Sequence, residues 1–339
     1  MALTLTYKIY EMPLRHPFTI SRYTVNVQKT LIACISDGSI SGFGEATVNP
    51  YYNSTAEKLA TSISRIQPII NLAQELHPSD FWKAIHAHLT DDFFALCAVD
   101  IAYWDYYARL NQKSLRSYFS DSGITPLTSY TIGIDTIATM KQKIIEMPWP
   151  IYKIKLGTGN DVQIVESLRN VTDAVFRIDA NGAWNAKQAI EYAFIFQDLN
   201  VEFIEQPLPA NDIIGMRQVK AQSAIAVIAD ESCQQLVDVK KCAELFHGIN
   251  IKLMKCGGIT PAIKMIGLAR SYGLSVMAGC MTESTVGISA LAQIAPLLDY
   301  LDSDGALLLK QDIATGVTFD SGKILYAEGY GTGAELYPL

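Results

Sequence analysis

The segments VFRIDANG (175–182), VEFIEQP (201–207) and IAVIADES (225–232) each read as a short apolar strand that ends in an acid. The acids are Asp179, Glu205 and Asp230, and successive acids are 26 and 25 residues apart. Each interval leaves room for one helix and one strand, so the acids return to the same end of a predicted parallel sheet. Converging carboxylates repel one another unless a divalent cation lies between them, and all-oxygen ligation is typical of Mg²⁺. The sequence therefore predicts a magnesium site.

The same alternation of strand and helix patterns extends over residues 126–317. Strands are predicted at residues 128–134, 152–156, 175–179, 201–205, 226–229, 248–252 and 274–278, with a weaker strand near residue 300. Helices are predicted between them, for example at residues 161–171, 186–199 and 261–271, the last with Thr260 as its cap and Pro261 at its first position. This pattern predicts a (β/α)7β-type modified TIM barrel, whose active site lies at the carboxyl ends of the strands.

Residues 1–125 show a different pattern, which predicts an α+β capping domain. Its expected strands are residues 3–10, 28–36 and 40–46, and its expected helices are residues 55–72, 81–89 and 92–110. Asp37-Gly38 predicts a hairpin turn, and Pro68 is expected to break the first helix. The tail from about residue 318 to residue 339 is expected to pack back on this domain.

Composition excludes several classes of protein. The hydrophobic content of 49% argues against disorder, and a net charge of −7 without a basic cluster argues against nucleic-acid or membrane partners. The six cysteines show no C-x-x-C spacing and lie mostly among apolar residues, so we expect reduced core thiols. The first residues alternate like a strand rather than like a signal peptide, and no segment is apolar enough to span a membrane. A cytoplasmic protein is expected.

Four further side chains are predicted to face the magnesium site. In YKIKL (152–156), Lys153 and Lys155 share one face of a strand, and in INIKLMKCGG (249–258), Asn250 and Lys252 share a face four strands later. Strands two and six of an eight-stranded ring lie opposite each other, so Lys155 and Lys252 can flank one ligand from two sides. Opposed lysines suggest proton transfer at both faces of one carbon, with Lys153 and Mg²⁺ lowering the pKa of Lys155. Lys255 has the opposite parity and is expected in a loop or an outer shell.

These motifs, together with GFGEA (42–46), resemble those of the enolase superfamily over nearly the whole chain, and in particular its muconate-lactonizing subgroup. The resemblance implies that Lys155 and Lys252 are the acid/base pair and that Asp179, Glu205 and Asp230 bind Mg²⁺. It also implies a homo-oligomer.

The run YLDSDGALLLKQD (300–312) resembles the D-x-D segment of dipeptide epimerases. By this resemblance Asp302 and Asp304 bind the α-ammonium group of a dipeptide, since two acids on one face need a cationic partner. The implied reaction is a 1,1-proton transfer at the α-carbon of the C-terminal residue of an L-Ala-L-Xaa dipeptide, by way of an enediolate.

Specificity for Xaa is expected to come from lid loops near residues 15–25 and 49–56. Alanyl-glutamate epimerases tend to place an arginine in this lid, whereas the corresponding position here is Tyr23, beside Arg22. With Tyr51 and Tyr52 also present, an apolar or small Xaa is favoured. Further candidate substrate-binding residues are Lys153, Thr131, Cys280, Met281 and Thr282.

Other interpretations stay open. The chain can be an L-Ala-D/L-Glu epimerase, or an o-succinylbenzoate synthase or muconate cycloisomerase that needs no ammonium site. A lysine Schiff-base enzyme and a non-catalytic ligand-binding barrel are more remote alternatives. Taken singly, Asp230 can be a helix cap, and the D-x-D run can be a solvated turn.

Overall fold

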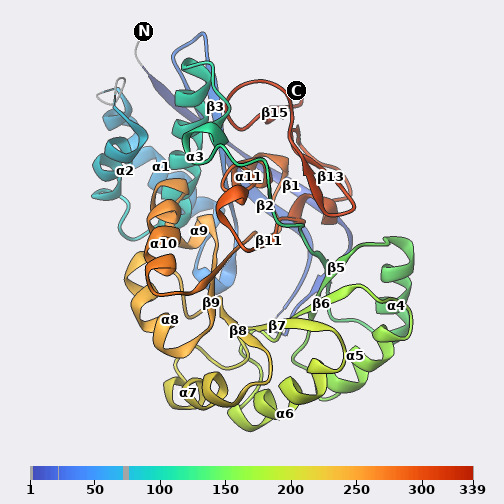
Figure 1. Cartoon of the computed structure of the whole chain (residues 1–339). Coiled ribbons are helices and arrows are strands. Elements are labelled where there is room, and N and C mark those ends of the chain that lie inside the picture. Colours follow the sequence, from blue (N-terminus) through green and yellow to red (C-terminus); the bar gives the residue numbers. More distant parts are fainter. Residues whose placement is uncertain (1–2, 22, 72–75, 339) are drawn as a thin grey trace.

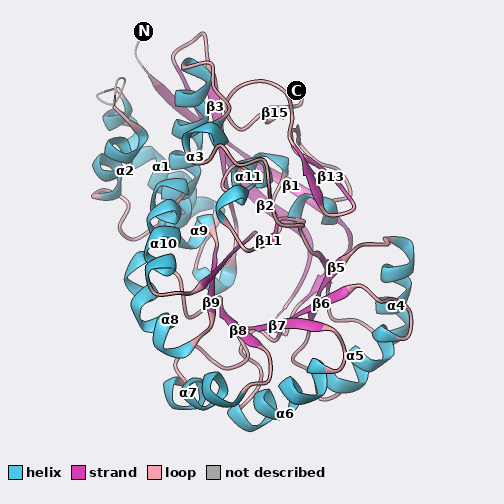
Figure 2. Cartoon of the chain, in the orientation of Figure 1, coloured by secondary structure: helices cyan, strands magenta, loops and turns pink. Residues whose placement is uncertain are grey.

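The computed structural model describes residues 3–21, 23–71 and 76–338. An eight-stranded, mostly parallel barrel is flanked by helices, and a three-stranded antiparallel sheet with its own helices lies against it (Figure 1). Figure 2 shows the barrel strands as an inner ring with helices outside it. The predicted fold class, a modified (β/α)7β barrel with an α+β capping domain, is confirmed.

The antiparallel sheet contains β1 (Thr4–Thr19), β2 (Thr24–Ser36) and β3 (Ser41–Thr47) in that order. The hairpin turn between β2 and β3 forms at the predicted place, because the Asp37 carboxylate accepts hydrogen bonds from the backbone N–H groups of Ser39 and Ile40.

β1 extends well beyond the predicted residues 3–10. Its pairing with β2 is interrupted after Pro13 and resumes at Phe18, so the long β1–β2 hairpin continues to its tip. The tip reaches the barrel, where Ile134 N donates to Thr19 O at 2.9 Å. Local alternation could not predict this extension, because the strand is held by pairing across an irregularity.

The helices of this domain are α1 (Ala56–Ile70), α2 (Pro78–His86) and α3 (Phe93–Leu110). The expected break at Pro68 is wrong, because α1 continues to Ile70. Pro68 lies in the last turn, where its missing N–H removes one helical hydrogen bond, and the burial of Ile66 and Ile70 holds that turn in the core.

The GFGEA motif lets α3 pack directly on β3. A Cβ atom at Gly44 would lie only 2.0 Å from Ala98 O, and one at Gly42 would lie 2.2 Å from Tyr106 N. Only glycine permits this approach of helix to strand. Glu45, which follows Gly44 in β3, accepts hydrogen bonds from Ser284 and Gly287 at the start of α11 (Thr285–Ala292).

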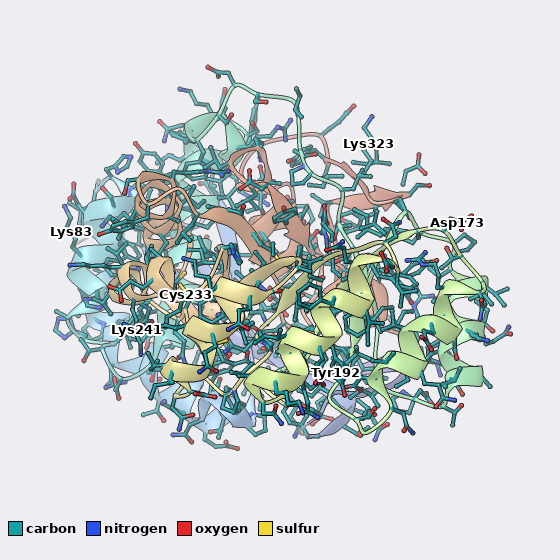
Figure 3. The ribbon with its side chains drawn as sticks, turned by 60° about the horizontal axis from the view of Figure 1, so that its bottom comes forward. Lys83, Asp173, Tyr192, Cys233, Lys241 and Lys323 are labelled. Atoms are coloured by element: carbon teal, nitrogen blue, oxygen red, sulfur yellow. The ribbon has the colours of Figure 1, made fainter. Side chains whose placement is uncertain are left out.

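The barrel strands follow one another in chain order, each hydrogen-bonded to the next in a parallel register: β4 (Tyr130–Ile132), β5 (Ile151–Lys155), β6 (Val175–Asp179), β7 (Val201–Glu205), β8 (Ala226–Ala229), β9 (Gly248–Ile251), β10 (Ser275–Gly279) and β11 (Tyr300–Asp302). The helices that follow them are α4 (Ile137–Glu146), α5 (Asp161–Arg169), α6 (Ala186–Gln197), α7 (Ile213–Gln222), α8 (Val239–Leu245), α9 (Leu253–Cys256), α10 (Ile259–Ser271) and α11 (Thr285–Ala292). Figure 3 brings the underside of the molecule forward and shows Tyr192 on α6 in this outer layer.

α10 begins one residue before the predicted cap. Its N-cap is Gly258, and Thr260 lies inside the first turn. The Thr260 hydroxyl instead donates to Asp100 of α3 at 2.7 Å. The threonine therefore joins the barrel to the capping domain rather than starting the helix.

The barrel closes between β4 and β11 by a seam of side-chain hydrogen bonds. Backbone contact is limited to an isolated bridge between Thr128 and Leu301. The remaining closure comes from Ser303 N, which donates to Thr128 Oγ1 at 2.7 Å, and from Thr131 N, which donates to Asp304 Oδ2 at 2.6 Å. This limited pairing explains why the strand predicted at residues 128–134 is only three residues long.

The C-terminal tail contains β13 (Thr318–Asp320), β14 (Lys323–Leu325) and β15 (Glu335–Leu336), which pairs with β12 (Ala314–Thr315). Gly331 exchanges backbone hydrogen bonds with Lys113 and Leu115, just after α3. No helix among the described residues is long and apolar enough to cross a membrane.

Candidate active site at the barrel mouth

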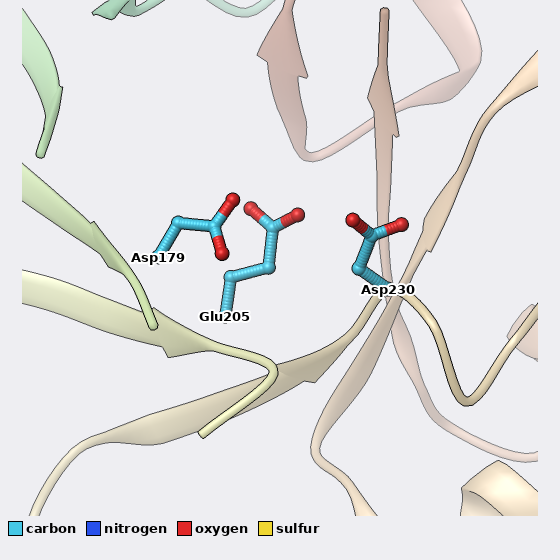
Figure 4. A group of neighbouring side chains, drawn as sticks. All are labelled: Asp179, Glu205 and Asp230. Carbon is cyan, nitrogen blue, oxygen red and sulfur yellow. The ribbon is translucent and has the colours of Figure 1, made fainter. Parts of the chain in front are cut away.

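The structure brings the three predicted metal-binding acids together. Asp179 and Glu205 are register partners at the ends of β6 and β7, and Asp230 directly follows β8. Their ligand oxygens lie within 4.8 Å of one another, and all three side chains are buried. In Figure 4 the carboxylates point into the same space, with Glu205 between the two aspartates.

This donor set fits a hard divalent cation such as Mg²⁺. Burial and the neighbouring Asp179 raise the pKa of Glu205 to about 7. A buried carboxylate in this position gains from a positive charge between the acids. The chemistry of the ligands therefore agrees with the predicted magnesium site.

Three predicted lysines surround these acids. Lys153 Nζ lies 2.8 Å from Glu205 Oε2 and 3.2 Å from Asp179 Oδ2, and Lys155 Nζ lies 2.6 Å from Asp179 Oδ2. On the other side, Lys252 Nζ lies 2.9 Å from Asp230 Oδ2. β5 and β9 are four strands apart in the eight-stranded order, so Lys155 and Lys252 approach the acids from opposite sides.

The lysines and acids shift one another's pKa values. Burial alone would raise the pKa of Asp179, but Lys155 and Lys153 outweigh it and lower the pKa to about 2. Burial alone would lower the pKa of Lys252, but Asp230 outweighs it and raises the pKa well above its usual range. For a neutral Lys252, part of the charge of Asp230 must be taken up by a cation.

Two residues behind the acids, Asn250 and Lys255, had no predicted role as partners of particular acids. Asn250 Nδ2 donates to Glu205 Oε1 at 2.7 Å, on the strand face it shares with Lys252. Lys255, three residues after Lys252 in α9, is buried and its Nζ lies 2.6 Å from Asp230 Oδ1. Both therefore hold metal-binding acids from outside the pocket. Lys255 lies in the outer shell, as expected. Its i,i+3 spacing from Lys252 in KLMK was the sequence signal that both lysines point toward Asp230.

The D-x-D acids are buried beside the barrel seam. Asp302 Oδ2 lies 2.7 Å from Lys153 Nζ, and Asp302 Oδ1 accepts from Ser129 Oγ at 2.9 Å. Asp304 accepts from the backbone N–H and the hydroxyl of Thr131. The solvated-turn alternative is wrong, since Asp302 and Asp304 are only 3% and 2% exposed.

Burial and the neighbouring Asp302 raise the pKa of Asp304 to about 7. Lys153 pairs with Asp302, whereas no lysine or arginine of the described residues forms an ion pair with Asp304. An ammonium group placed between the two aspartates would supply a positive charge there.

The pocket above these groups is lined from both domains. From the capping domain come β1, β2 and the segment after β3 with the short helix η1 (Pro50–Tyr52), and from the barrel come the strand ends and the loop after β10. Among the predicted substrate-binding residues, those lining this pocket are Thr131, Lys153, Tyr23, Tyr51, Tyr52, Cys280, Met281, Thr282, Asp302 and Asp304. Arg22 lies outside the described residues.

The lid side of the pocket is apolar and aromatic. Among the described residues it contains Phe18, Ile20, Tyr23 and Val25, and the capping-domain residues there include no lysine or arginine. Asn181 and Glu231, which were not predicted, line the pocket next to the metal-binding acids. Both directly follow such an acid within two residues, which was the signal available in the sequence.

Comparison with known proteins agrees with this geometry. Residues 4–118 match the model of the mandelate racemase / muconate lactonizing enzyme N-terminal domain, and residues 135–338 match the enolase C-terminal domain-like model. The chain therefore belongs to the mandelate racemase / muconate lactonizing enzyme family of the enolase superfamily. It is 49% identical over 335 residues to an L-Ala-D/L-amino acid epimerase of Flavobacterium johnsoniae, covering 98% of this chain and 100% of that protein.

Solved enolase-superfamily structures share the whole fold. The substrate-liganded L-Ala-D/L-Glu epimerase of Bacillus subtilis superimposes with a TM-score of 0.93 at 26% identity, covering 100% of each chain. The dipeptide epimerase of Enterococcus faecalis complexed with Mg and L-Leu-L-Tyr superimposes with a TM-score of 0.89 at 28% identity, covering 98% of this chain and 99% of that chain.

Proposed function

We propose that the protein is a Mg²⁺-dependent dipeptide epimerase that inverts the α-carbon of the C-terminal residue of L-Ala-L-Xaa dipeptides. The observation that carries this proposal is the simultaneous presence of two opposed lysines at a carboxylate triad and of two buried aspartates across the same pocket. The F. johnsoniae relative, which acts on L-Ala-D/L-amino acid substrates by its name, supports it.

The two ends of a dipeptide have separate partners in this pocket. The α-ammonium group would lie at Asp302 and Asp304, next to the seam, and the terminal carboxylate would lie at the triad on β6 to β8. This orientation would place the α-carbon of the second residue between Lys155 and Lys252. Holding both ends lowers the entropic cost of reaching the reactive geometry.

The proton transfer follows from the opposed lysines. One neutral lysine removes the α-proton, and the ammonium form of the other delivers a proton to the opposite face, which inverts the carbon. Bound Mg²⁺ would offset the negative charge that develops on the substrate carboxylate during this step. Lys153, between Glu205 and Asp302, contributes a fixed positive charge at the same end of the substrate.

For Xaa we propose an apolar or small residue. The described part of the lid offers Phe18, Ile20, Tyr23 and Val25, which match an apolar side chain by burial of surface. A glutamate side chain would lose water there without gaining a cation from these residues.

The experiment is proton NMR of the purified protein in D₂O with Mg²⁺ and a set of L-Ala-L-Xaa dipeptides. We expect the α-proton signal of the second residue to disappear and the L,D diastereomer to accumulate, fastest for apolar and small Xaa. Exchange confined to L-Ala-L-Glu would contradict the proposed specificity for Xaa but would still support the proposed epimerisation. No exchange with any dipeptide would overturn the proposed function.

We also propose a cytoplasmic location and a homo-oligomeric state. All six cysteines are free thiols in the fold, which suits a reducing compartment. The oligomeric state follows from the resemblance to the superfamily alone, and light scattering coupled to size exclusion tests it.

A further inference from the structure

We propose that Glu45 and Glu283 share one proton across the domain interface and act as positioning residues for the Met281–Thr282 wall of the pocket. The shared proton does not depend on the proposed epimerase activity, whereas the effect on substrate binding rests on it. Neither glutamate lines the pocket, so neither is a catalytic residue.

The two carboxyl groups converge inside the protein. Glu45 comes from β3 of the capping domain and Glu283 from the loop between β10 and α11, and they are 0% and 5% exposed. A Cβ atom at Gly287 would lie 2.2 Å from Glu283 Oε2 and 3.0 Å from Glu45 Oε2. A side chain at this position would collide with Glu283, so the glycine leaves room for both carboxyl groups beside α11. Two carboxylates cannot both stay ionised in such a place without a cation.

The hydrogen bonds of the two glutamates are unequal. Glu45 accepts from Thr30 Oγ1 at 2.8 Å, from both the N–H and the hydroxyl of Ser284, and from Gly287 N at 2.9 Å. These donors stabilise an ionised Glu45 at the amino end of α11. Glu283 receives one such bond, from Met281 N at 2.7 Å. The proton therefore resides on Glu283, and Oε2 of Glu283 is the atom that holds it toward Glu45.

The charges around the pair agree with this assignment. Burial and the nearby Glu45 raise the pKa of Glu283 to about 8, and burial raises the pKa of Glu45. The charged and titratable groups that interact with the pair from neighbouring elements are Lys252 at the end of β9, Cys97 of α3 and Cys280 after β10. Asp312 lies at the same end of α11, where its carboxylate accepts from Thr285, the first residue of that helix. Lys252 is the one cation among these groups, and Asp230 already pairs with it.

The pair connects directly to the substrate pocket. Glu283 Oε1 holds the backbone N–H of Met281, and Met281 Sδ lies 3.6 Å from Asn49 Nδ2 of the capping domain. Met281 and Asn49 both line the pocket. A second negative charge beside Glu45 would push Glu283 away and release Met281. Loss of the proton should therefore weaken substrate binding more than it slows proton transfer.

The first experiment follows the proton itself. Infrared difference spectra between pH 7.5 and pH 9.5 should show loss of a protonated-carboxyl carbonyl band in the wild type, and this band should be missing in Glu283→Gln. Glu45→Gln should shift the titration of this band to lower pH, since the neighbouring charge is gone. A band that does not titrate above pH 7.5 in the wild type, or one that persists in Glu283→Gln, would overturn the proposal.

The second experiment measures unfolding temperature against pH without substrate. An acid with a raised folded pKa holds more protons in the folded state, so its contribution to stability decreases from about pH 4.5 to about pH 8. The unfolding temperature of the wild type should therefore drop by a few degrees relative to Glu283→Gln over this range. Parallel curves for the two proteins would contradict a protonated Glu283.

The third experiment separates positioning from plain stability. Between pH 7 and pH 9, KM for an L-Ala dipeptide should rise several-fold in the wild type, and this rise should be absent in Glu283→Gln.

Asp100→Asn is the matched control, because Asp100 is also a buried carboxyl that joins the domains, through Thr260, but it does not line the pocket. This control should change stability with pH and leave the rise in KM in place. An equal loss of the rise in both variants would reduce Glu283 to a structural residue. If no dipeptide is turned over, the first two experiments still decide on the proton.

Discussion

Lys153 Nζ lies 2.7 Å from Asp302 Oδ2, and this ion pair joins the carboxylate triad to the site proposed for the substrate ammonium group. The same Nζ atom lies 2.8 Å from Glu205 Oε2. One buried lysine thus neutralises an acid at each end of the substrate-binding region. Lys153→Met should weaken binding at both ends and leave two buried carboxylates without a cation.

Two measurements test the Lys153→Met prediction. Unfolding by denaturant should show a protein destabilised by several kcal/mol, about 3–5 for a broken buried ion pair. Calorimetry should show altered Mg²⁺ binding as well as a higher KM for dipeptides. A variant with wild-type stability and an altered KM only would contradict the central position of this lysine.

Replacing the opposed lysines singly should separate the two halves of the reaction. Lys155→Ala and Lys252→Ala should each lower the rate of epimerisation by at least about 100-fold, since a general base is lost. Each variant should still exchange the α-proton of one epimer in D₂O, and the two variants should act on opposite epimers. NMR with L,L and L,D dipeptides checks this. Exchange of both epimers by either variant would show that the two lysines do not act on separate faces.

Asn250 should matter for metal binding without touching the metal. Its amide holds Glu205 Oε1, so Asn250→Leu should reduce Mg²⁺ affinity by about 10–100-fold, the usual effect of losing a group that orients a ligand. Titration calorimetry with Mg²⁺ and no substrate measures it. Asn170→Leu, at an exposed helix end, is the control and should bind Mg²⁺ like the wild type.

Asp304 should set the acidic limb of the pH profile. Its pKa of about 7 means that it takes up a proton as the pH falls through 7, and a neutral Asp304 binds the ammonium group less well. The value of kcat/KM for dipeptides should therefore decrease below about pH 7. Asp304→Asn should lower kcat/KM by about tenfold or more and lose this limb. An unchanged limb in the variant would assign it to another group.

Tyr23 should influence the choice of the second residue. Tyr23→Arg would place a cation in the aromatic lid, and a charged hydrogen bond to glutamate should raise kcat/KM for L-Ala-L-Glu by about tenfold relative to L-Ala-L-Leu. Tyr23→Phe is the control and should leave the ratio of the two substrates unchanged. A shift of the same size in both variants would mean that the lid acts through packing alone.

The sequence predicted those features that depend on local pattern and strand parity. Asp179, Glu205 and Asp230 ended apolar runs at nearly equal spacing, and a parallel barrel had to bring them together. Pairing that crosses an irregularity was not predictable, as in the continuation of β1 past Pro13. Neither was Glu45, because its role depends on a barrel loop 238 residues further along the chain at Glu283. Contacts of this kind depend on packing between domains, which leaves no periodic signal in the sequence.

The seam between β4 and β11 has a consequence for how this fold can change its substrate. The aspartates proposed to bind the ammonium group also close the cylinder, since Asp304 accepts from Thr131 N and Asp302 accepts from Ser129 Oγ. If a related enzyme evolved to bind substrates without an amine and replaced these acids by apolar residues, it would lose the hydrogen bonds that close the barrel as well as the ammonium site. Asparagine at either position would keep an acceptor without the charge. A change of substrate away from amines therefore requires asparagine at these positions before any apolar residue can replace them.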